Sequence, residues 1–464
     1  MFCIATFICR AEIALSRAEE AIRLQGSQSK GRKRKDESGW AGSVSDDSQF
    51  PNEASASPGK GRTQKYLGER GLIALITFLS AFVPLSTDLY LPALPGMAKY
   101  FGVSADLANL TLILFFVFFS AGTLLWGPLS DKYGRRPVLL IGLSIYSAAS
   151  LGCAGSWDIY HLIAFRILQA VGGSGAFAVA TAMIKDVYDS RSREPILAMV
   201  QSMVLISPAA APVLGALLLK FVSWRGVFFA LAGVGLLALA GSIALQETVD
   251  KRYTGSMLQA VARIGKVARN PGFSSLLALF SLLSVSTLAF IASSSYIYID
   301  GFGLSEQAYS YYFALNAFGM IGGPMLYMKV SRKVSRRSIV IACFALVSLS
   351  GLLVATLGGL SPWIFAALLL PSTIASSAVR TPGANLMLEQ QKEDTGSAAA
   401  LMSCFGIFMG SIGMTIISLG WSNTILVLGV MNILMGLACT ALWLLISERP
   451  FVKRVPERFV AAAK

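Results

Sequence analysis

The sequence predicts an all-α membrane protein with twelve transmembrane helices in two pseudo-symmetric six-helix bundles. Of its 464 residues, 55% are hydrophobic and only 14% are charged, whereas soluble domains carry about a quarter charged residues. After residue 70 the apolar residues fall into twelve segments, each long enough to cross a hydrocarbon core as a helix. The longest polar connection between them, residues 247–272, divides the segments six and six.

The amino-terminal residues 1–70 differ from the rest, and we expect a disordered cytoplasmic tail there. Residues 26–65 are polar and rich in Ser, Gly and Lys, a composition that cannot bury a core. The basic run at residues 30–35 has the charge to bind anionic lipid or nucleic acid, but a solvated tail is the simpler interpretation. A mis-assigned translation start is an alternative explanation for this segment.

The twelve segments define two bundles. The first six are predicted to form an N-terminal bundle over residues 71–246, and the last six a C-terminal bundle over residues 273–447, with a cytoplasmic loop at 247–272 and a basic cytoplasmic tail at 448–464. The segments lie at about 71–94, 105–127, 138–155, 158–184, 196–219, 225–245, 273–297, 309–329, 339–358, 361–381, 397–418 and 422–446.

The basic residues indicate the orientation of the chain. The formal net charge is +14, yet after residue 70 the Lys and Arg residues of the loops gather on one side, with only Lys99, Lys220 and Arg225 on the other. This asymmetry follows the positive-inside rule. It accounts for the charge without a nucleic-acid partner and places both termini in the cytoplasm of a multi-pass protein of the inner (plasma) membrane.

A weak internal repeat supports the division into halves. Residues 330–338 (Val-Ser-Arg-Lys-Val-Ser-Arg-Arg-Ser) align with residues 129–137 (Leu-Ser-Asp-Lys-Tyr-Gly-Arg-Arg-Pro) at a constant offset of 201. In the second copy Arg332 replaces the acid and Ser335 replaces the glycine, while the paired arginines persist. Each copy follows the second segment of its half, as expected for parallel six-helix repeats.

Few ionisable residues lie inside the apolar segments, and two of them stand out as functional candidates because charges are costly in lipid. Asp88 lies in segment one without a basic residue within a helical turn. Burial favours the neutral form of a carboxyl group, so Asp88 is a candidate to take up and release a proton. A helix-end carboxylate in water, with Pro92 and Pro95 ending the segment, is the alternative. Arg166 lies about nine residues into segment four, where it is either functional or bonded to backbone carbonyl groups.

Four motifs resemble those of a known family. The loop that runs Gly127-Pro-Leu-Ser-Asp131-Lys-Tyr-Gly134-Arg135-Arg136 resembles the pattern G-x-L-x-D-x-x-G-R-R between helices two and three of the major facilitator superfamily. Asp88-Leu-Tyr90-Leu-Pro, Arg166-Ile-Leu-Gln169 and Ser207-Pro208-Ala-Ala-Ala-Pro212-Val-Leu-Gly215 resemble motifs of its twelve-span drug:proton antiporters, related to bicyclomycin and chloramphenicol resistance exporters. Ala170, Ser207 and Ala216 stand where that branch usually has glycine.

This resemblance implies proton-coupled efflux of drug-like or antibiotic molecules by alternating access, with protons, a small-molecule substrate and the bilayer as partners of a monomer. Asp88 and Arg166 would couple protons to transport. The cavity would include Tyr90, Gln169, Tyr296 and Asn316. The gates would involve Gly127, Asp131, Gly134, Arg135, Arg136, Pro208, Pro212 and Gly215. Proton-coupled transport of a small metabolite, such as a sugar, amino acid or nucleoside, is the alternative.

The sequence lacks the residues that metal sites, enzymes and ATP-driven pumps require. The chain has one histidine and no cysteine pair with metal or disulfide spacing, so we expect no metal, no cofactor and no enzymatic activity. Residues 26–33 are the nearest approach to a phosphate-binding loop, but they lack the Gly-Lys-Ser/Thr ending, which argues against a pump driven by ATP.

Overall fold

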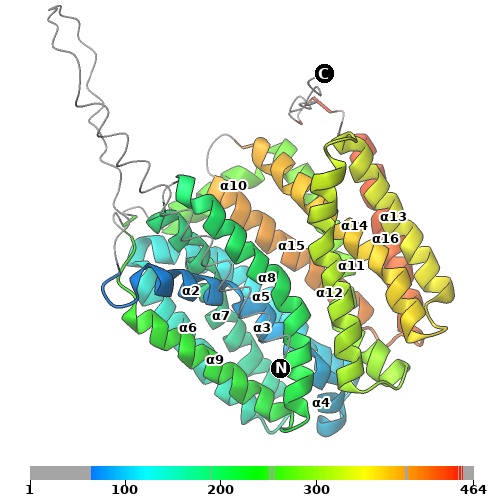
Figure 1. Ribbon diagram of the computed structural model, residues 1–464, viewed down its shortest axis with the longest axis horizontal. Coiled ribbons are helices and arrows are strands. Elements are labelled where there is room, and N and C mark those ends of the chain that lie inside the picture. The colour runs from blue at the N-terminus through cyan, green and yellow to red at the C-terminus, as the bar shows by residue number, and fades with distance from the viewer. Residues whose placement is uncertain are drawn as a thin grey trace, which may run out of the picture.

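The computed structural model describes residues 64–188, 190–249, 252–253, 257–391, 395–447, 449–450 and 452. Within these ranges the regular structure is entirely helical (Figure 1), which confirms the predicted fold class. Of the tails predicted at 1–70 and 448–464, residues 1–63, 448, 451 and 453–464 lie outside the described residues, whereas α2 already begins at Gly68.

Span one is a broken helix. It consists of α2 (Gly68–Ser80), α3 (Phe82–Asp88), the 3-10 turn η1 (Leu91–Ala93) and α4 (Leu94–Phe101), with a bend of 45° between its first and later parts. Proline lacks an N–H, so Pro84, Pro92 and Pro95 each remove one backbone hydrogen bond. The prediction that this span ends near residue 94 is wrong, because the chain turns helical again and continues to Phe101.

The rest of the N-terminal half has five long helices, which also extend beyond several predicted boundaries. They are α5 (Ala105–Tyr133), α6 (Arg135–Ala154), α7 (Ile159–Val187), α8 (Ser190–Leu219) and α9 (Trp224–Ala244). Because α5 runs to Tyr133, the predicted loop at 127–137 is helical up to that residue. Gly134 alone separates α5 from α6.

The C-terminal half begins with a short amphipathic helix and continues with six spans. The helices are α10 (Met257–Ala268), α11 (Pro271–Ser295) with a π-helical turn η2 (Tyr296–Gly301), α12 (Glu306–Val330), α13 (Arg336–Leu357), α14 (Pro362–Glu389), α15 (Thr395–Ile417) and α16 (Thr424–Ile446). Helix α10 lies within the connection between the halves, where the sequence predicted only a loop.

Twelve spans result, although they do not all look alike by composition. Among the described residues, nine helices are long and apolar enough to cross a membrane, and the broken span one makes a tenth. Helix α8 is apolar enough only over Ile206–Leu219, and α12 is rich in Tyr and Gly. These two helices complete the twelve.

The two halves share one hydrophobic core at one end and have separate cores at the other. We call the end with the loops at residues 132–136 and 331–337 the basic end. At the opposite end a single hydrophobic cluster joins the halves, with Tyr90 and Phe228 from the first and Tyr298 and Phe365 from the second. At the basic end each half has its own cluster. The halves are therefore closed against each other at the opposite end.

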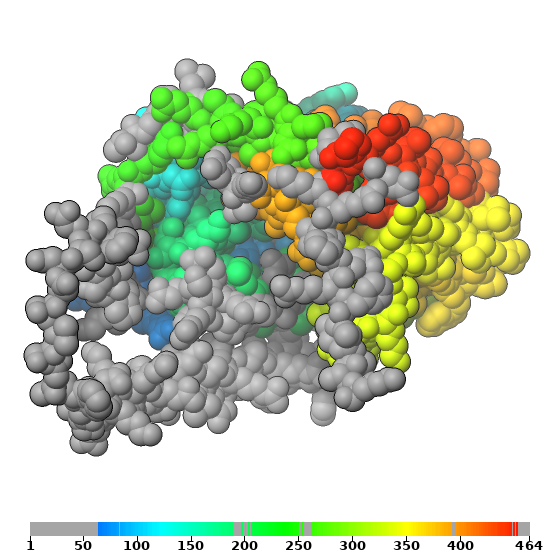
Figure 2. All heavy atoms as spheres, turned by 90° about the horizontal axis from the view of Figure 1, so that it is seen from above, coloured from blue at the N-terminus to red at the C-terminus, as the bar shows by residue number. Residues whose placement is uncertain are grey.

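Contacts between the halves involve matching pairs of helices. Helix α5 packs against α15, and α8 packs against α12. Helix α10 contacts both α15 and α5, so it bridges the halves at the basic end. Figure 2, viewed from the top of Figure 1, shows the green segment that includes α10 extending along one edge toward the red C-terminal helix.

The predicted repeat has a structural counterpart. Helix α6 begins at Arg135 and α13 begins at Arg336, which reproduces the offset of 201 found in the sequence. Gly134 has φ +107°, whereas Ser335 has φ −62° and caps α13 with its own hydroxyl group, which accepts from the Ser338 N–H at 3.2 Å. The exchange of glycine for serine therefore reflects two different ways of starting the same helix.

Candidate functional site

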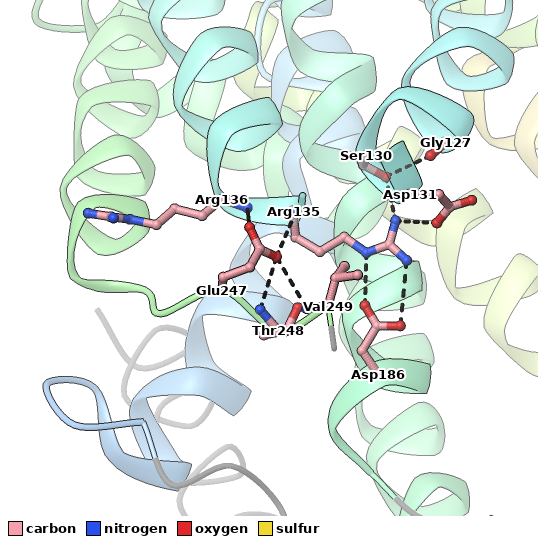
Figure 3. Close-up of polar contacts among 9 residues, drawn as sticks. All are labelled: Gly127, Ser130, Asp131, Arg135, Arg136, Asp186, Glu247, Thr248 and Val249. Carbon is pink, nitrogen blue, oxygen red and sulfur yellow. Dashed lines mark hydrogen bonds and ion pairs between the residues drawn. The ribbon is translucent and has the colours of Figure 1, made fainter. Parts of the chain in front are cut away.

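Arg135 is the centre of a charge network at the basic end (Figure 3). Its Nη1 lies 2.6 Å from Asp131 Oδ1 and donates to Ser130 Oγ at 2.5 Å, while its Nε donates to Asp186 Oδ2 at 2.8 Å. The Arg135 side chain is 7% exposed, compared with 54% for Asp131. A buried guanidinium between two carboxylates holds its position because both partners pair its charge. The network ties the end of α5 to the end of α7.

Glu247 caps helix α6 from the far end of the half. Its carboxylate accepts hydrogen bonds from the backbone N–H groups of Arg135 at 2.8 Å and Arg136 at 3.2 Å. The first N–H groups of a helix have no partner within the helix, and a negative charge there also interacts favourably with the helix dipole. A Cβ at Gly134 would displace this carboxylate from its capping position, and the positive φ at this position also favours glycine.

Replacing Glu247 with Ala is expected to destabilise the protein by about 1 kcal/mol, the usual cost of losing a helix cap. Glu247→Gln should lose less, because one amide oxygen can still accept an N–H. The measurement is the thermal unfolding of the purified protein in detergent. Glu306→Ala is the matched control, since Glu306 also lies in a first helical turn but α12 is capped by Ser305. Equal effects of Glu247→Ala and Glu306→Ala would contradict the capping role.

Asp131 pairs with only one of the two arginines predicted for the gate. Asp131 pairs with Arg135, whereas the Arg136 guanidinium donates to the Ile243 carbonyl at the end of α9 at 2.9 Å. Gly127 lies inside α5, and a Cβ added there would meet nothing within 4 Å. Sequence reasoning missed Asp186 and Glu247. One clue in the sequence could have pointed to an acidic partner: a helix that starts at Arg135 needs an acceptor for its first backbone N–H groups.

The second half repeats the pairing of Arg135 in a simpler form. Arg336, at the start of α13, lies 3.6 Å from Glu389 at the end of α14. Arg135 and Asp186 occupy the same positions at the start of α6 and the end of α7. Each half therefore has an ion pair between its third and fourth spans at the basic end.

Asp88 is buried where span one breaks. It is the last residue of α3 and is 5% exposed, and its Oδ1 accepts a hydrogen bond from Thr87 Oγ1 at 3.0 Å. Pro92 has no N–H for the Asp88 carbonyl, which explains the break at this position. The alternative of a helix-end carboxylate in water does not fit, because the helix resumes at Leu91. No other carboxylate in the described part of the chain is this buried.

Arg166 is fully buried in α7 and is held mainly by neutral groups. Its Nη1 donates to Gln169 Oε1 at 2.6 Å and to the Ser86 carbonyl at 3.1 Å. The guanidinium lies 4.3 Å from the ring centre of Tyr90 and 4.2 Å from that of Phe115, a geometry in which aromatic faces stabilise a cation. Ser86 lies two residues before Asp88, so Arg166 is attached directly to the segment that carries the acid.

Two of the predicted cavity residues, Gln169 and Tyr90, extend the hydrogen-bond network around Arg166. Gln169 Nε2 donates to Ser150 Oγ at 2.7 Å, and Tyr90 OH lies 3.0 Å from Thr111 Oγ1. Both side chains are fully buried. In this state Gln169 and Tyr90 therefore fix Arg166 rather than lining an open cavity.

The predicted motif of span five packs against Leu89, the residue after Asp88. Pro208, Pro212 and Gly215 lie in α8, and a Cβ added to Gly215 would collide with the Leu89 carbonyl. The next residue, Ala216, accepts a hydrogen bond through its carbonyl from Gln307 Nε2 of α12 at 3.0 Å. This stretch of α8 thus lies between the segment that carries Asp88 and the other half of the protein.

The remaining predicted cavity residues, Tyr296 and Asn316, belong to the second half. Tyr296 begins the π-helical turn η2, and its hydroxyl group is buried without a hydrogen-bond partner among the described residues. Asn316 lines a pocket within the C-terminal half. The structure therefore places the six predicted coupling and cavity residues in two groups, with Asp88, Tyr90, Arg166 and Gln169 in the first half.

Two other ionisable residues, Arg380 and His161, lie outside these two groups. Arg380 lies well inside α14, which continues to Glu389, and its side chain is exposed. The single histidine, His161, has Nδ1 2.6 Å from Asp158 Oδ2 at the start of α7. The N–H of His161 and then its ring hold the pKa of Asp158 below its usual range. His161 lies at the opposite end from the basic loops and outside both groups.

Comparison with known proteins identifies the family. The sequence model of the Major Facilitator Superfamily matches residues 76–414. The chain belongs to this superfamily. It is therefore a multi-pass membrane transporter and not an enzyme, as the sequence predicted.

Named relatives cover most of the chain. The MFS-type transporter YdgK of Bacillus subtilis is 28% identical over 387 residues, which are 82% of this chain and 96% of YdgK. A chloramphenicol resistance protein of Pseudomonas aeruginosa is 30% identical over 392 residues, 80% of this chain and 91% of that protein. A crystal structure of a D-xylose-proton symporter has a similar fold, with a TM-score of 0.62 at 15% identity over 79% of this chain and 96% of the symporter.

Proposed function

We propose that this protein exports small drug-like molecules in exchange for protons by alternating access. The observation that carries the proposal is Asp88, a buried carboxylate at a break in span one, with Arg166 bonded to the same segment. A carboxyl group at such a position can change protonation when its surroundings open to water on one side or the other. The likeness to a chloramphenicol resistance protein supports drug-like molecules as the substrate class.

The closed end defines the state of the cycle. The positive-inside rule assigns the basic end to the cytoplasm. We therefore infer an inward-facing state, because the halves share a core at the opposite end and have separate cores at the basic end. In the proposed cycle Asp88 takes up a proton when the protein faces outward and releases it inside. The drug and that proton compete for the outward-directed state of the protein. One proton crossing 100 mV supplies about 2.3 kcal/mol, and each pH unit adds about 1.4 kcal/mol.

Arg166 has a supporting role in this cycle. Its fixed charge lies next to the Asp88 segment, so it favours the ionised carboxylate whenever Asp88 moves closer to it. In the present state no ion pair joins the two side chains. Gly215 lets α8 approach Leu89, and the same stretch of α8 bonds to α12. A change at Asp88 can therefore reach the interface between the halves.

An ion pair at the opposite end is expected to stabilise the inward-facing state. Lys99 Nζ of α4 lies 2.8 Å from Asp300 Oδ1 of η2, across the two halves. Lys99→Ala should shift the population toward the outward-facing state, and the exchange Lys99→Asp with Asp300→Lys should restore it. The measurement is the distance distribution between spin labels at the exposed positions Val222 and Tyr311, in the first and second halves.

Lys220→Ala is the matched control, because Lys220 is an exposed lysine at the same end outside the described ion pairs. A distance distribution in Lys99→Ala that matches both wild type and the control would contradict this role for the ion pair.

The proposed function is tested by efflux from cells that overexpress the intact chain, with chloramphenicol and a lipophilic cation as probes. Efflux that stops when a protonophore is added is the expected result. No export of either probe, with proton-dependent accumulation of a sugar, amino acid or nucleoside instead, would overturn it in favour of metabolite transport.

A further inference from the structure

A pocket inside the C-terminal half is set apart from Asp88 and Arg166. Its walls come from α11, α12, α14 and α16, all in the second half. Two phenylalanines, Phe290 and Phe313, stack in its wall with ring centres 5.8 Å apart and an angle of 12°. The polar side chains of the wall are Ser286, Thr287, Asn316, Ser372, Thr373, Ser376 and Asn432.

Most of these polar groups are already paired within the wall. Ser372 Oγ donates to Asn432 Oδ1 at 2.9 Å, and Asn432 Nδ2 donates to the Leu428 carbonyl at 3.1 Å. The Thr287 hydroxyl donates to the Leu283 carbonyl at 3.0 Å. These bonds stiffen the wall and leave its hydroxyl hydrogens unavailable to a ligand.

Among the buried polar groups of the wall, two have no hydrogen-bond partner in the described part of the chain. Asn316 uses its Oδ1 to accept from the Thr373 hydroxyl, but its Nδ2 has no partner in the described part of the chain. Ser286 Oγ has none either. Asn316 is 3% exposed and Ser286 is 4% exposed. Unpaired polar groups are rarely buried without a reason, because each loses its bonds to water. A ligand acceptor that reached either group would give it a hydrogen-bond partner.

The pocket carries no charge. None of the described side chains that line it is acidic or basic, so a charged group entering it would lose its hydration without gaining a counter-ion. A neutral group would lose less hydration free energy on entering the pocket and could accept a hydrogen bond from the Asn316 amide. The stacked rings and the aliphatic wall provide apolar contact for the rest of such a group.

We propose that this pocket binds an uncharged, hydrogen-bond-accepting substituent of the transported molecule, such as an amide carbonyl or a nitro group. The proposal rests on the proposed function, because it specifies the substrate class of that transport. Asn316 Nδ2 and Ser286 Oγ donate to the acceptor, and Phe290 and Phe313 contact its apolar neighbour. Lipophilic cations, in contrast, depend on Asp88 in the first half. The two halves thereby recognise different chemical groups.

The test is direct binding to the purified full chain, with radiolabelled chloramphenicol as the neutral probe and tetraphenylphosphonium as the cation. Chloramphenicol carries an amide and a nitro group. Asn316→Leu has a similar side-chain volume and no donor, and it should weaken chloramphenicol binding about tenfold, as should Ser286→Ala to a smaller extent. In both pocket variants the affinity for the cation should stay within about twofold of wild type. In Asp88→Asn, the affinity for the cation should fall, while that for chloramphenicol should stay within about twofold.

Ser293→Ala is the matched control. Ser293 lies on the same helix and is equally buried, but its hydroxyl donates to the Ala289 carbonyl at 2.9 Å and does not line the pocket. Unchanged chloramphenicol affinity in Asn316→Leu, an equal loss for both probes, or no chloramphenicol binding by wild type would each overturn the proposal. Binding and transport are measured separately, so failure of proton-coupled efflux alone would count against the proposed function and not against the pocket.

Discussion

Asp88→Asn is expected to abolish proton-driven efflux while leaving the protein folded. Asparagine has nearly the same shape but cannot exchange a proton, and no other described carboxylate is as deeply buried as Asp88. One proton crossing 100 mV can sustain a concentration ratio of about 50, and in the variant this ratio should fall to about 1. The measurement is steady-state drug accumulation in energised cells, with and without a protonophore.

Asp106→Asn is the control for this prediction, because Asp106 is an exposed carboxylate in the first turn of α5 in the same half. Its efflux should match wild type. Asp88→Asn protein that still builds a protonophore-sensitive gradient would show that the proton site lies elsewhere. Downhill drug flux should persist in Asp88→Asn, since the fold and the neutral pocket remain.

Arg166→Lys is expected to reduce proton-coupled efflux to below about a tenth of wild type. Lysine keeps the charge but not the planar group that lies over Tyr90 and Phe115 and bonds to Gln169 and the Ser86 carbonyl. Arginine and lysine are not equivalent at a stacked site with several hydrogen bonds. The measurement is the initial efflux rate, normalised to the amount of folded protein found by size-exclusion chromatography.

Arg225→Lys provides a matched control for the loss of stacking itself. Arg225 lies 4.9 Å from the ring centre of Tyr100 and 4.4 Å from that of Trp224, and it donates to the Ser156 carbonyl at 3.0 Å. It lies at the end away from the basic loops, so its lysine variant should keep normal efflux. Equal loss in both variants would mean that Arg166 has a structural role only.

The sequence predicted the helical fold well because lipid imposes a simple rule. A segment that crosses hydrocarbon must satisfy its own backbone, so length and apolar composition locate the spans. The rule is weak where a helix is broken or faces mostly protein. Span one was therefore assigned too short, since prolines that usually end a helix only break it here, and α10 was missed because its amphipathic pattern lay in a polar connection.

The candidate site was predictable where partners are close in sequence. Asp131 and Arg135 are four residues apart, and their ion pair lies within one turn of chain around Gly134. Asp186 and Glu247 lie 51 and 112 residues from Arg135, and no local pattern connects them to it. The motif also does not predict the partner of Arg136, which follows Arg135 directly but bonds to a different helix, α9.

The amino-acid sequence by itself determined the membrane fold, the two halves with their offset of 201 residues, and the ionisable residues inside spans, because each depends on composition and spacing along one segment. Only the tertiary structure decided which end is closed, that Arg166 attaches to the segment before Asp88, and that Asn316 and Ser286 leave unpaired groups in a neutral pocket. These features depend on which side chains from distant helices meet. Packing sets those contacts, and periodicity does not specify them.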